Sequence, residues 1–336
     1  MRRGITFLII LAAVMLLLLS SGCGGGKRDF RKSLDELRAK AAQGDTEAQI
    51  NLGGLYTSGR GVPQDDREAM KWYRQAADLG DAAAQNNLGV IYEKGRGVSR
   101  NNLEAMKWYR QAATQGYAPA QLNLGSIYRE GQGVPQNYQE AMKWYQRAAA
   151  QGDTAAQFCL AVMYYEGQGV PKDEQEAMRW YRQAAELGYA KAQNNLGTMY
   201  HKGQGVARDE QEAIKWYRQA AEQGDAMAQN NLGTMYSQGQ GVSRDDIEGY
   251  AWIIIAAKNG VKKAGETQEQ LKRTLNTSQI SAVQQRAKQI LADLKQKRQL
   301  AQVVAKGHVV VPDVTPPPKS FSRAREQRGE TKTRKT

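Results

Sequence analysis

The sequence predicts an all-α protein in which helical hairpins stack into a solenoid. All six tryptophans, from Trp72 to Trp252, stand 36 residues apart without a slip. The leucine at Leu52 and the tyrosine at Tyr56 recur at the same spacing through six units. A fixed period between about 20 and 50 residues is typical of stacked supersecondary units. We therefore expect six such units between residues 45 and 260.

The first half of each unit has the pattern of an amphipathic helix. In the second unit Ala84, Leu88 and Ile91 fall on one helical stripe, which predicts the buried face. Gly95 and Gly97 follow, as residues do where a helix ends in left-handed backbone. This G-x-G motif recurs in every unit without a preceding strand or a third glycine. We interpret it as a turn and not as a nucleotide-binding loop.

The second half of each unit begins with a capping signal. Asp or Asn is followed three residues later by Glu in all six units, as at Asn101 and Glu104. This D/N-x-x-E pattern before an apolar stripe predicts the start of a second helix. The stripe combines aromatic residues such as Trp108 with alanines such as Ala112, which let helices approach closely. A glycosidase would need its pair of carboxylates once, so six copies favour capping.

The motifs L-G-x-x-Y, G-x-G-V and A-x-x-W-Y-x-x-A-A together resemble the Sel-one-like repeat family, a relative of the tetratricopeptide repeat. The resemblance covers residues 45–260 and implies a right-handed superhelix of helix-turn-helix pairs that acts as a scaffold for protein partners. Ala161 departs from the family pattern by replacing a helix glycine in the fourth unit. Gly249 and Ile253 alter the sixth unit, as expected where a terminal repeat becomes a cap.

The N-terminus has the features of an export signal. Arg2 and Arg3 precede an apolar run of 15 residues, and small residues follow it. The run is shorter than the roughly 20 residues that span a bilayer. Residues 1–22 therefore predict a signal peptide, with an N-terminal membrane anchor as the alternative.

Cys23 and the glycines after it resemble a bacterial lipoprotein signal. In that interpretation the cysteine is acylated and residues 23–28 form a tether. Ser20 stands where the lipoprotein pattern prefers leucine, so cleavage for ordinary secretion stays open. All three alternatives place the chain in the cell envelope, attached to a membrane or on the periplasmic or other extracytoplasmic side.

Three further segments flank the repeats. Residues 29–44 are in phase with the second helices, so we expect a lone helix that closes the N-terminal end. Residues 261–306 predict a helical hairpin or one long helix, with a helix start at Thr277. Residues 307–336 are rich in Pro, Lys and Arg, which predicts a disordered tail.

The net charge of +13 is unevenly distributed. Residues 29–257 sum to −3, whereas residues 258–306 carry +8 and the tail carries +4. A nucleic-acid-binding body would carry its positive charge on the folded face, so we expect no specific nucleic-acid partner. The basic C-terminal region is expected to contact an anionic surface such as lipid headgroups, with solubility alone as the alternative.

Residues for catalysis are scarce. The chain has two histidines and two cysteines, which leaves little for a metal site or a general base. Cys159 stands where the other five units have asparagine, and we expect an inert thiol. We expect no catalytic residue, cofactor or metal. The predicted function is a scaffold for protein–protein interaction, and the alternative is a cell-envelope enzyme or subunit that acts directly on cell-wall polymer.

The partner-binding surface is expected on the first helices, which line the concave side of solenoids of this kind. On the side opposite the buried stripe the residues differ from unit to unit. Phe158 and Tyr165 would supply apolar contacts, and Glu93, Arg129 and His201 would supply polar selectivity. The pattern by which some tetratricopeptide domains hold a C-terminal carboxylate is missing, which favours an internal segment of the partner.

Overall fold

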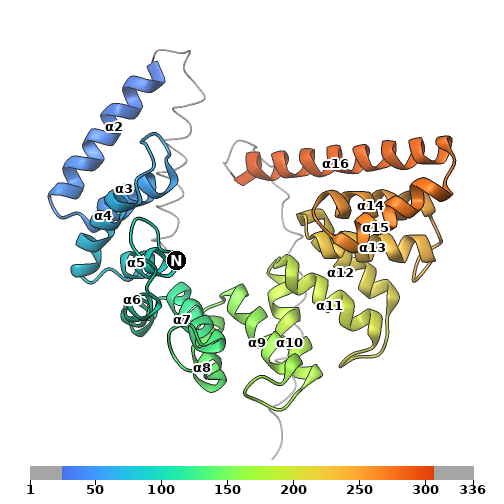
Figure 1. Ribbon diagram of the computed structural model, residues 1–336, viewed down its shortest axis with the longest axis horizontal. Coiled ribbons are helices and arrows are strands. Elements are labelled where there is room, and N and C mark those ends of the chain that lie inside the picture. The colour runs from blue at the N-terminus through green and yellow to red at the C-terminus, as the bar shows by residue number, and fades with distance from the viewer. Residues whose placement is uncertain (1–24, 306–336) are drawn as a thin grey trace, which may run out of the picture. The chain divides into compact units, whose positions relative to one another are not determined.

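The computed structural model describes residues 25–305, in which all regular structure is helical (Figure 1). Cys23, the export segment and the basic tail lie outside these residues. The first helices of the six pairs are α3 (Thr46–Ser58), α5 (Ala82–Lys94), α7 (Ala118–Glu130), α9 (Thr154–Glu166), α11 (Ala190–Lys202) and α13 (Ala226–Gln238). The second helices are α4 (Asp66–Asp78), α6 (Asn102–Thr114), α8 (Tyr138–Ala150), α10 (Glu174–Glu186), α12 (Glu210–Gln223) and α14 (Asp246–Lys258).

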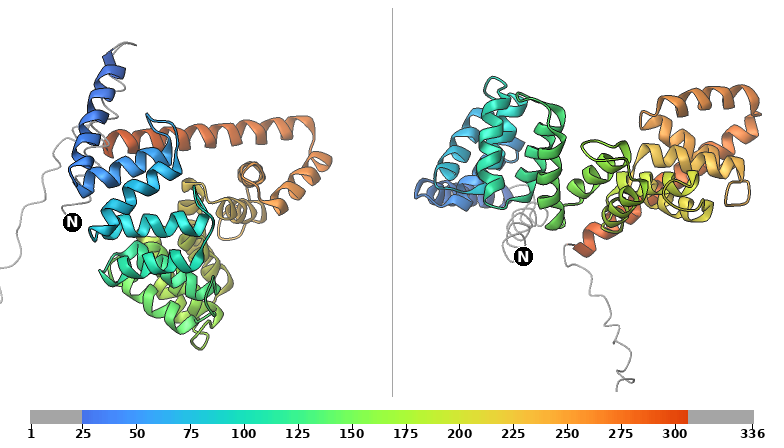
Figure 2. Two further views of the ribbon diagram at one scale, coloured as in Figure 1. Left: turned by 60° about the vertical axis from the view of Figure 1, so that its left-hand side comes forward. Right: turned by 90° about the horizontal axis from the view of Figure 1, so that it is seen from below.

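Each helix packs against the next one along the chain, from α2 (Gly25–Ala42) through the six pairs to α15 (Lys262–Thr274). The same order can be followed in both views of Figure 2. In an α-solenoid each helical repeat packs only against the repeats before and after it in the sequence. The predicted all-α solenoid is confirmed.

The helix ends follow the chemistry expected from the sequence. Asn101 precedes α6, and its Oδ1 accepts a hydrogen bond of 3.1 Å from the backbone N–H of Glu104. Gly95 ends α5 with φ of 65°. A Cβ atom at Gly97, which has φ of 67°, would lie 2.9 Å from the backbone nitrogen of Arg67 in the preceding pair. The G-x-G motif is therefore a turn that packs closely on the neighbouring repeat.

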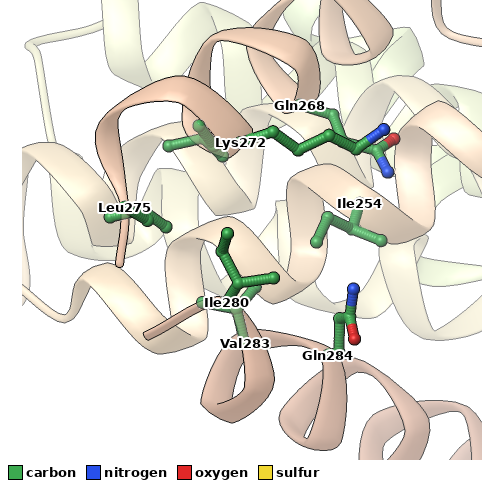
Figure 3. Close-up of a pocket in the computed structure, with 8 residues that line it drawn as sticks. Ile254, Gln268, Lys272, Leu275, Ile280, Val283 and Gln284 are labelled. Atoms are coloured by element: carbon green, nitrogen blue, oxygen red, sulfur yellow. The ribbon is translucent and has the colours of Figure 1, made fainter. Parts of the chain in front are cut away.

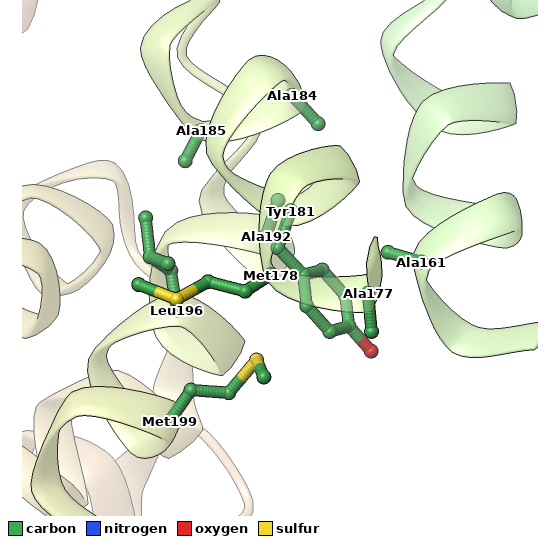
Figure 4. Packing of buried hydrophobic residues seen from close by; sticks show 9 residues of the cluster. All are labelled: Ala161, Ala177, Met178, Tyr181, Ala184, Ala185, Ala192, Leu196 and Met199. Atoms are coloured by element: carbon green, nitrogen blue, oxygen red, sulfur yellow. The ribbon is translucent and has the colours of Figure 1, made fainter. Parts of the chain in front are cut away.

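The core is a series of small clusters, each shared by adjacent helices. Figure 4 shows the cluster formed by α9, α10 and α11, in which Tyr181 and Leu196 are surrounded by alanines and methionines. Close approach depends on a glycine in the first helix: a Cβ atom at Gly125 would lie 2.6 Å from Cε1 of Tyr145. Ala161 occupies the equivalent place in the fourth repeat and is fully buried.

A buried glutamine in the first helix connects most pairs to the helix before them and to the end of their own second helix. In the third repeat Gln121 Nε2 donates to the carbonyl oxygen of Ala113 at 3.1 Å, and Gln121 Oε1 accepts from Gln151 Nε2 at 2.8 Å. The same amide pairing joins Gln85 to Gln115, Gln193 to Gln223 and Gln229 to Asn259. We call these contacts the glutamine ladder.

The ladder is interrupted twice. Leu79 and Leu187 take the place of the donor amide, and their side chains are exposed. The Oε1 atoms of Gln49 and Gln157, which the amide would reach, are buried without a hydrogen-bond partner among the described residues.

Both ends of the array carry extra helices. Phe30 of α2 lies against Gly61 in the way that each second helix meets the next G-x-G turn. Beyond α14 come α15 and α16 (Thr277–Ala305), and Arg286 of α16 donates to Glu248 of α14 at 2.5 Å. The chain divides into two compact units, Met1–Leu291 and Ala292–Thr336, and the described part of the second is the C-terminal part of α16. Between residues 25 and 305, no helix has the length and apolar character needed to cross a membrane.

Candidate functional site

Four of the five predicted partner-binding residues occupy one recurring place in consecutive first helices. Glu93, Arg129, Tyr165 and His201 are 36 residues apart, near the C-terminal ends of α5, α7, α9 and α11. We call these four residues the variable row, because one position carries an acid, a guanidinium, a phenol and an imidazole in turn. All four side chains are half-buried. Arg129 and His201 keep 27% and 31% of their side-chain surface exposed, enough for a partner to contact.

Each member of the variable row is held by a contact within the chain. Glu93 accepts a hydrogen bond of 2.5 Å from the hydroxyl of Tyr109, and Arg129 lies 2.9 Å from the carboxylate of Glu130. Tyr165 donates to Gln204 Oε1 at 3.0 Å. Such contacts restrict the rotamers of these side chains before any partner arrives, which lowers the entropy lost on binding.

His201 belongs to a charged group at the start of α12. Its Nδ1 lies 2.7 Å from Oε2 of Glu210, and Arg208 contacts the other oxygen of the same carboxylate at 2.6 Å. Burial alone would raise the pKa of Glu210, but the hydrogen bonds from His201 and Arg208 hold it below its usual range. The carboxylate is therefore ionised at neutral pH and orients the imidazole.

Phe158 differs from the variable row because it packs into the core. Its ring contacts Tyr181 and Tyr189, with centroid distances of 5.6 and 5.3 Å. Tyr189 stands at the N-cap of α11 and makes no side-chain capping bond there. Removing the Phe158 ring would leave a gap between these tyrosines, so Phe158 stabilises the fold as well as being a predicted contact residue.

The hydroxyl groups of buried tyrosines contact residues of the first helices, on the surface that carries the variable row. These hydroxyls were not among the residues predicted from the sequence. The hydroxyl of Tyr145 lies 3.1 Å from Ser126 Oγ, and that of Tyr217 donates to Thr198 Oγ1 at 3.0 Å. Burial raises the pKa of Tyr217 to about 12, although the hydrogen bond to Thr198 acts in the opposite direction. Sixteen tyrosines against four phenylalanines was the available signal that the hydroxyl itself is used.

Two kinds of reactive site, a metal centre and a nucleophilic thiol, can be assessed in the described part of the chain. Between residues 25 and 305, no group of three or more His, Cys, Asp and Glu side chains is placed to hold a metal ion. Burial raises the pKa of the Cys159 thiol, while the positive charge of Arg129 acts against this rise. The thiol is therefore protonated at neutral pH and is a poor nucleophile.

The C-terminal helices enclose a small apolar cavity of about 30 Å³ (Figure 3). Ile254, Leu275 and Val283 contribute to its walls, with the side chain of Lys272 along one side. This volume holds little more than a water molecule, so we interpret the cavity as a packing defect and not as a ligand site.

Comparison with known proteins agrees with this architecture. Residues 46–81, 82–117, 118–153, 154–189, 190–225 and 226–261 each match the Sel1 repeat model. No curated protein sequence matches the chain.

Two solved structures share both sequence and fold with this chain. The structure of a protective antigen from uropathogenic Escherichia coli, which displays an SLR fold, has 32% sequence identity and a TM-score of 0.72 over 87% of this chain. This chain spans 61% of the length of that antigen. A Sel1 repeat protein from Oxalobacter formigenes has 38% identity and a TM-score of 0.61, covering 68% of this chain and 94% of that one. The resemblance noted in the sequence is confirmed, and the chain belongs to the Sel1 repeat family.

Proposed function

We propose that this protein is a scaffold in the cell envelope, attached to a membrane through its N-terminus, that binds an internal segment of a partner protein along its first helices. The variable row is the observation that carries the proposal. The core positions repeat almost unchanged, whereas this half-exposed position differs chemically in four successive repeats, from Glu93 to His201. A surface that is structurally regular and chemically varied is suited to reading successive side chains of an extended partner.

The enzyme alternative receives no comparable support. It requires a cluster of nucleophile, acid or metal ligands, whereas the titratable groups of the variable row lie one per repeat, each in a separate contact within the chain. A scaffold needs only shape, charge and preorganised side chains.

Partner binding is tested with the triple variant Arg129→Ala, Tyr165→Ala and His201→Ala, which keeps Phe158 and every fully buried core residue, although Tyr165 also packs against the edge of the core. The full chain is expressed in its native organism, and bound proteins are captured after cross-linking and identified by mass spectrometry. We expect loss of the principal partner, because each substitution removes a side chain that is held towards the surface.

The matched control alters the exposed neighbours of the variable row on the same helices, Lys94→Ala, Glu166→Ala and Lys202→Ala, and leaves Glu130, which holds Arg129, in place. Helical content and melting temperature are measured for both triple variants. If the first variant keeps the partner and the control loses it, the variable row is not the binding surface.

Membrane attachment is tested separately with Cys23→Ser. If Cys23 is acylated, this variant loses acyl labelling and leaves the membrane fraction or accumulates as an uncleaved precursor. Membrane retention of an unlabelled wild type would favour the anchor. A wild type found in the soluble fraction would contradict both forms of attachment.

A further inference from the structure

One cation in each of the first five pairs is neutralised in a regular way. A Lys or Arg on the second helix forms an ion pair with the glutamate three residues before it. The pairs are Lys71–Glu68, Lys107–Glu104, Lys143–Glu140, Arg179–Glu176 and Lys215–Glu212, with distances between 2.5 and 2.9 Å. At this position of each pair the positive charge is therefore held by a carboxylate of the same helix.

The pattern ends at the sixth pair. Ala251 stands where the cation would be, and Glu248 instead pairs with Arg286 of α16 at 2.5 Å. Residues 262–298 then carry nine basic and three acidic side chains.

Four of these basic residues belong to the first compact unit, are exposed and form no ion pair among the described residues. They are Lys262, Lys263, Arg273 and Lys288. We call them the C-terminal basic cluster. Lys262 and Arg273 are about three turns apart on α15 and therefore lie on the same flank of that helix.

The chemistry of α15 and α16 identifies the kind of ligand. Residues 262–305 contain no aromatic residue, whereas binding to single-stranded nucleic acid depends on bases stacking on aromatic rings. On α16 Val283, Ala287 and Ile290 are buried, whereas Leu291 and Leu300 are exposed. Two separate leucines form no continuous apolar face for insertion into lipid, so attraction between fixed charges is the main contribution to binding.

We propose that the C-terminal basic cluster binds the surface of an anionic lipid bilayer. The choice of lipid over nucleic acid rests in part on the proposed membrane attachment, which would hold this surface near headgroups. Partner binding through the variable row is not required. Binding of this kind weakens as salt shortens the Debye length.

The test compares lysines within one molecule. The full chain is mixed with phosphatidylcholine vesicles, with and without phosphatidylglycerol, and treated with a water-soluble acetylating reagent. Mass spectrometry then gives the modification rate of each lysine.

On anionic vesicles in about 0.1 M NaCl we expect Lys262, Lys263 and Lys288 to react at least about threefold more slowly than on neutral vesicles. Rates should recover in about 1 M NaCl, where the Debye length falls to about 3 Å. Lys71, Lys107 and Lys215 serve as internal controls and should not change.

A charge variant strengthens the test. Lys262→Gln, Lys263→Gln and Arg273→Gln together should remove the protection of Lys288, because each basic residue near an anionic surface changes affinity about fivefold. The matched variant Lys71→Gln, Lys107→Gln and Lys215→Gln loses the same charge and should keep that protection.

Three results would overturn the proposal. Equal rates on neutral and anionic vesicles would exclude the lipid contact, and equal effects of the two variants would show that net charge alone acts. Protection by polyuridylate without protection by vesicles would assign the cluster to nucleic acid. Partner capture is measured independently, so its failure would leave this result unaffected.

Discussion

Replacing Gln151 by leucine should destabilise the protein through the glutamine ladder. Gln121 is 4% exposed, and its Oε1 atom depends on the 2.8 Å hydrogen bond from Gln151. Leaving a buried acceptor without a donor costs about 1–3 kcal/mol. The new leucine gains little burial, since Leu79 and Leu187 at the equivalent places are 64% and 61% exposed. We expect a loss of about 1.5 kcal/mol from the free energy of unfolding.

The reverse substitution, Leu187→Gln, is the matched experiment. The backbone angles at Gln151 are φ −89° and ψ 4°, and those at Leu187 are φ −81° and ψ 6°, so either residue fits either place. The new amide would supply the donor that Gln157 Oε1 lacks, and we expect a gain of about 1 kcal/mol.

Urea unfolding followed by circular dichroism measures both effects. With a slope of about 3 kcal/mol/M, the midpoint should fall by about 0.5 M for Gln151→Leu and rise for Leu187→Gln. Repeat arrays can unfold in parts, so hydrogen exchange of α7 and α8 reports the local change in Gln151→Leu.

A double-mutant cycle separates the hydrogen bond from other effects of the substitution. Gln151→Leu should lower the free energy of unfolding by less in a Gln121→Leu background than in the wild type. In that background the buried acceptor, Gln121 Oε1, is absent, so no acceptor is left without its donor. An unchanged midpoint for Gln151→Leu, or a lowered one for Leu187→Gln, would refute the assigned role of the ladder.

Three further predictions concern packing, the C-terminal contact and pH. Gly125→Ala should lower stability by about 1 kcal/mol, because its Cβ must displace the buried ring of Tyr145, and thermal unfolding would detect this. Arg286→Ala should speed hydrogen exchange in the N-terminal half of α16 by leaving Glu248 unpaired, and unchanged exchange would contradict that role. The pKa of Tyr217, raised to about 12, means that the folded state holds its proton more tightly than the unfolded state. Stability from this group is therefore complete below about pH 10 and is lost as the pH rises towards 12. In Tyr217→Phe the free energy of unfolding should fall less steeply between about pH 10 and 12 than in the wild type. The same pH dependence in both proteins would contradict the role of Tyr217.

Most of the fold could be predicted from the sequence because the same local residue pattern recurs in every repeat. The period located the pairs, and D/N-x-x-E and glycine marked the helix ends. Trp108, Tyr109 and Ala112, expected on the buried stripe of the second helix, are all buried. Thr277, the expected helix start, is the first residue of α16, and the cap is the residue before it, Asn276, whose Oδ1 accepts a hydrogen bond of 2.9 Å from the backbone N–H of Gln279.

The glutamine ladder could not be predicted by the same reasoning. Glutamine is usually exposed, and Gln121 is buried only because its amide finds a backbone carbonyl eight residues earlier and a side chain thirty residues later. Its recurrence in all six repeats was the available signal. The contacts of the variable row have the same origin, since the partners of Glu93 and Tyr165 come from neighbouring helices and loops.

The junctions of the array have an evolutionary consequence. Phe30 meets Gly61 at the N-terminal end much as Asp66 meets Gly97 between the first two pairs, so the capping helix uses the same joint as an internal repeat. A duplication or deletion of one whole repeat would therefore create a joint that already exists elsewhere in the protein. The length of the array can change in steps of 36 residues while both terminal helices remain in place, which lets selection lengthen or shorten the protein without first solving a new packing problem.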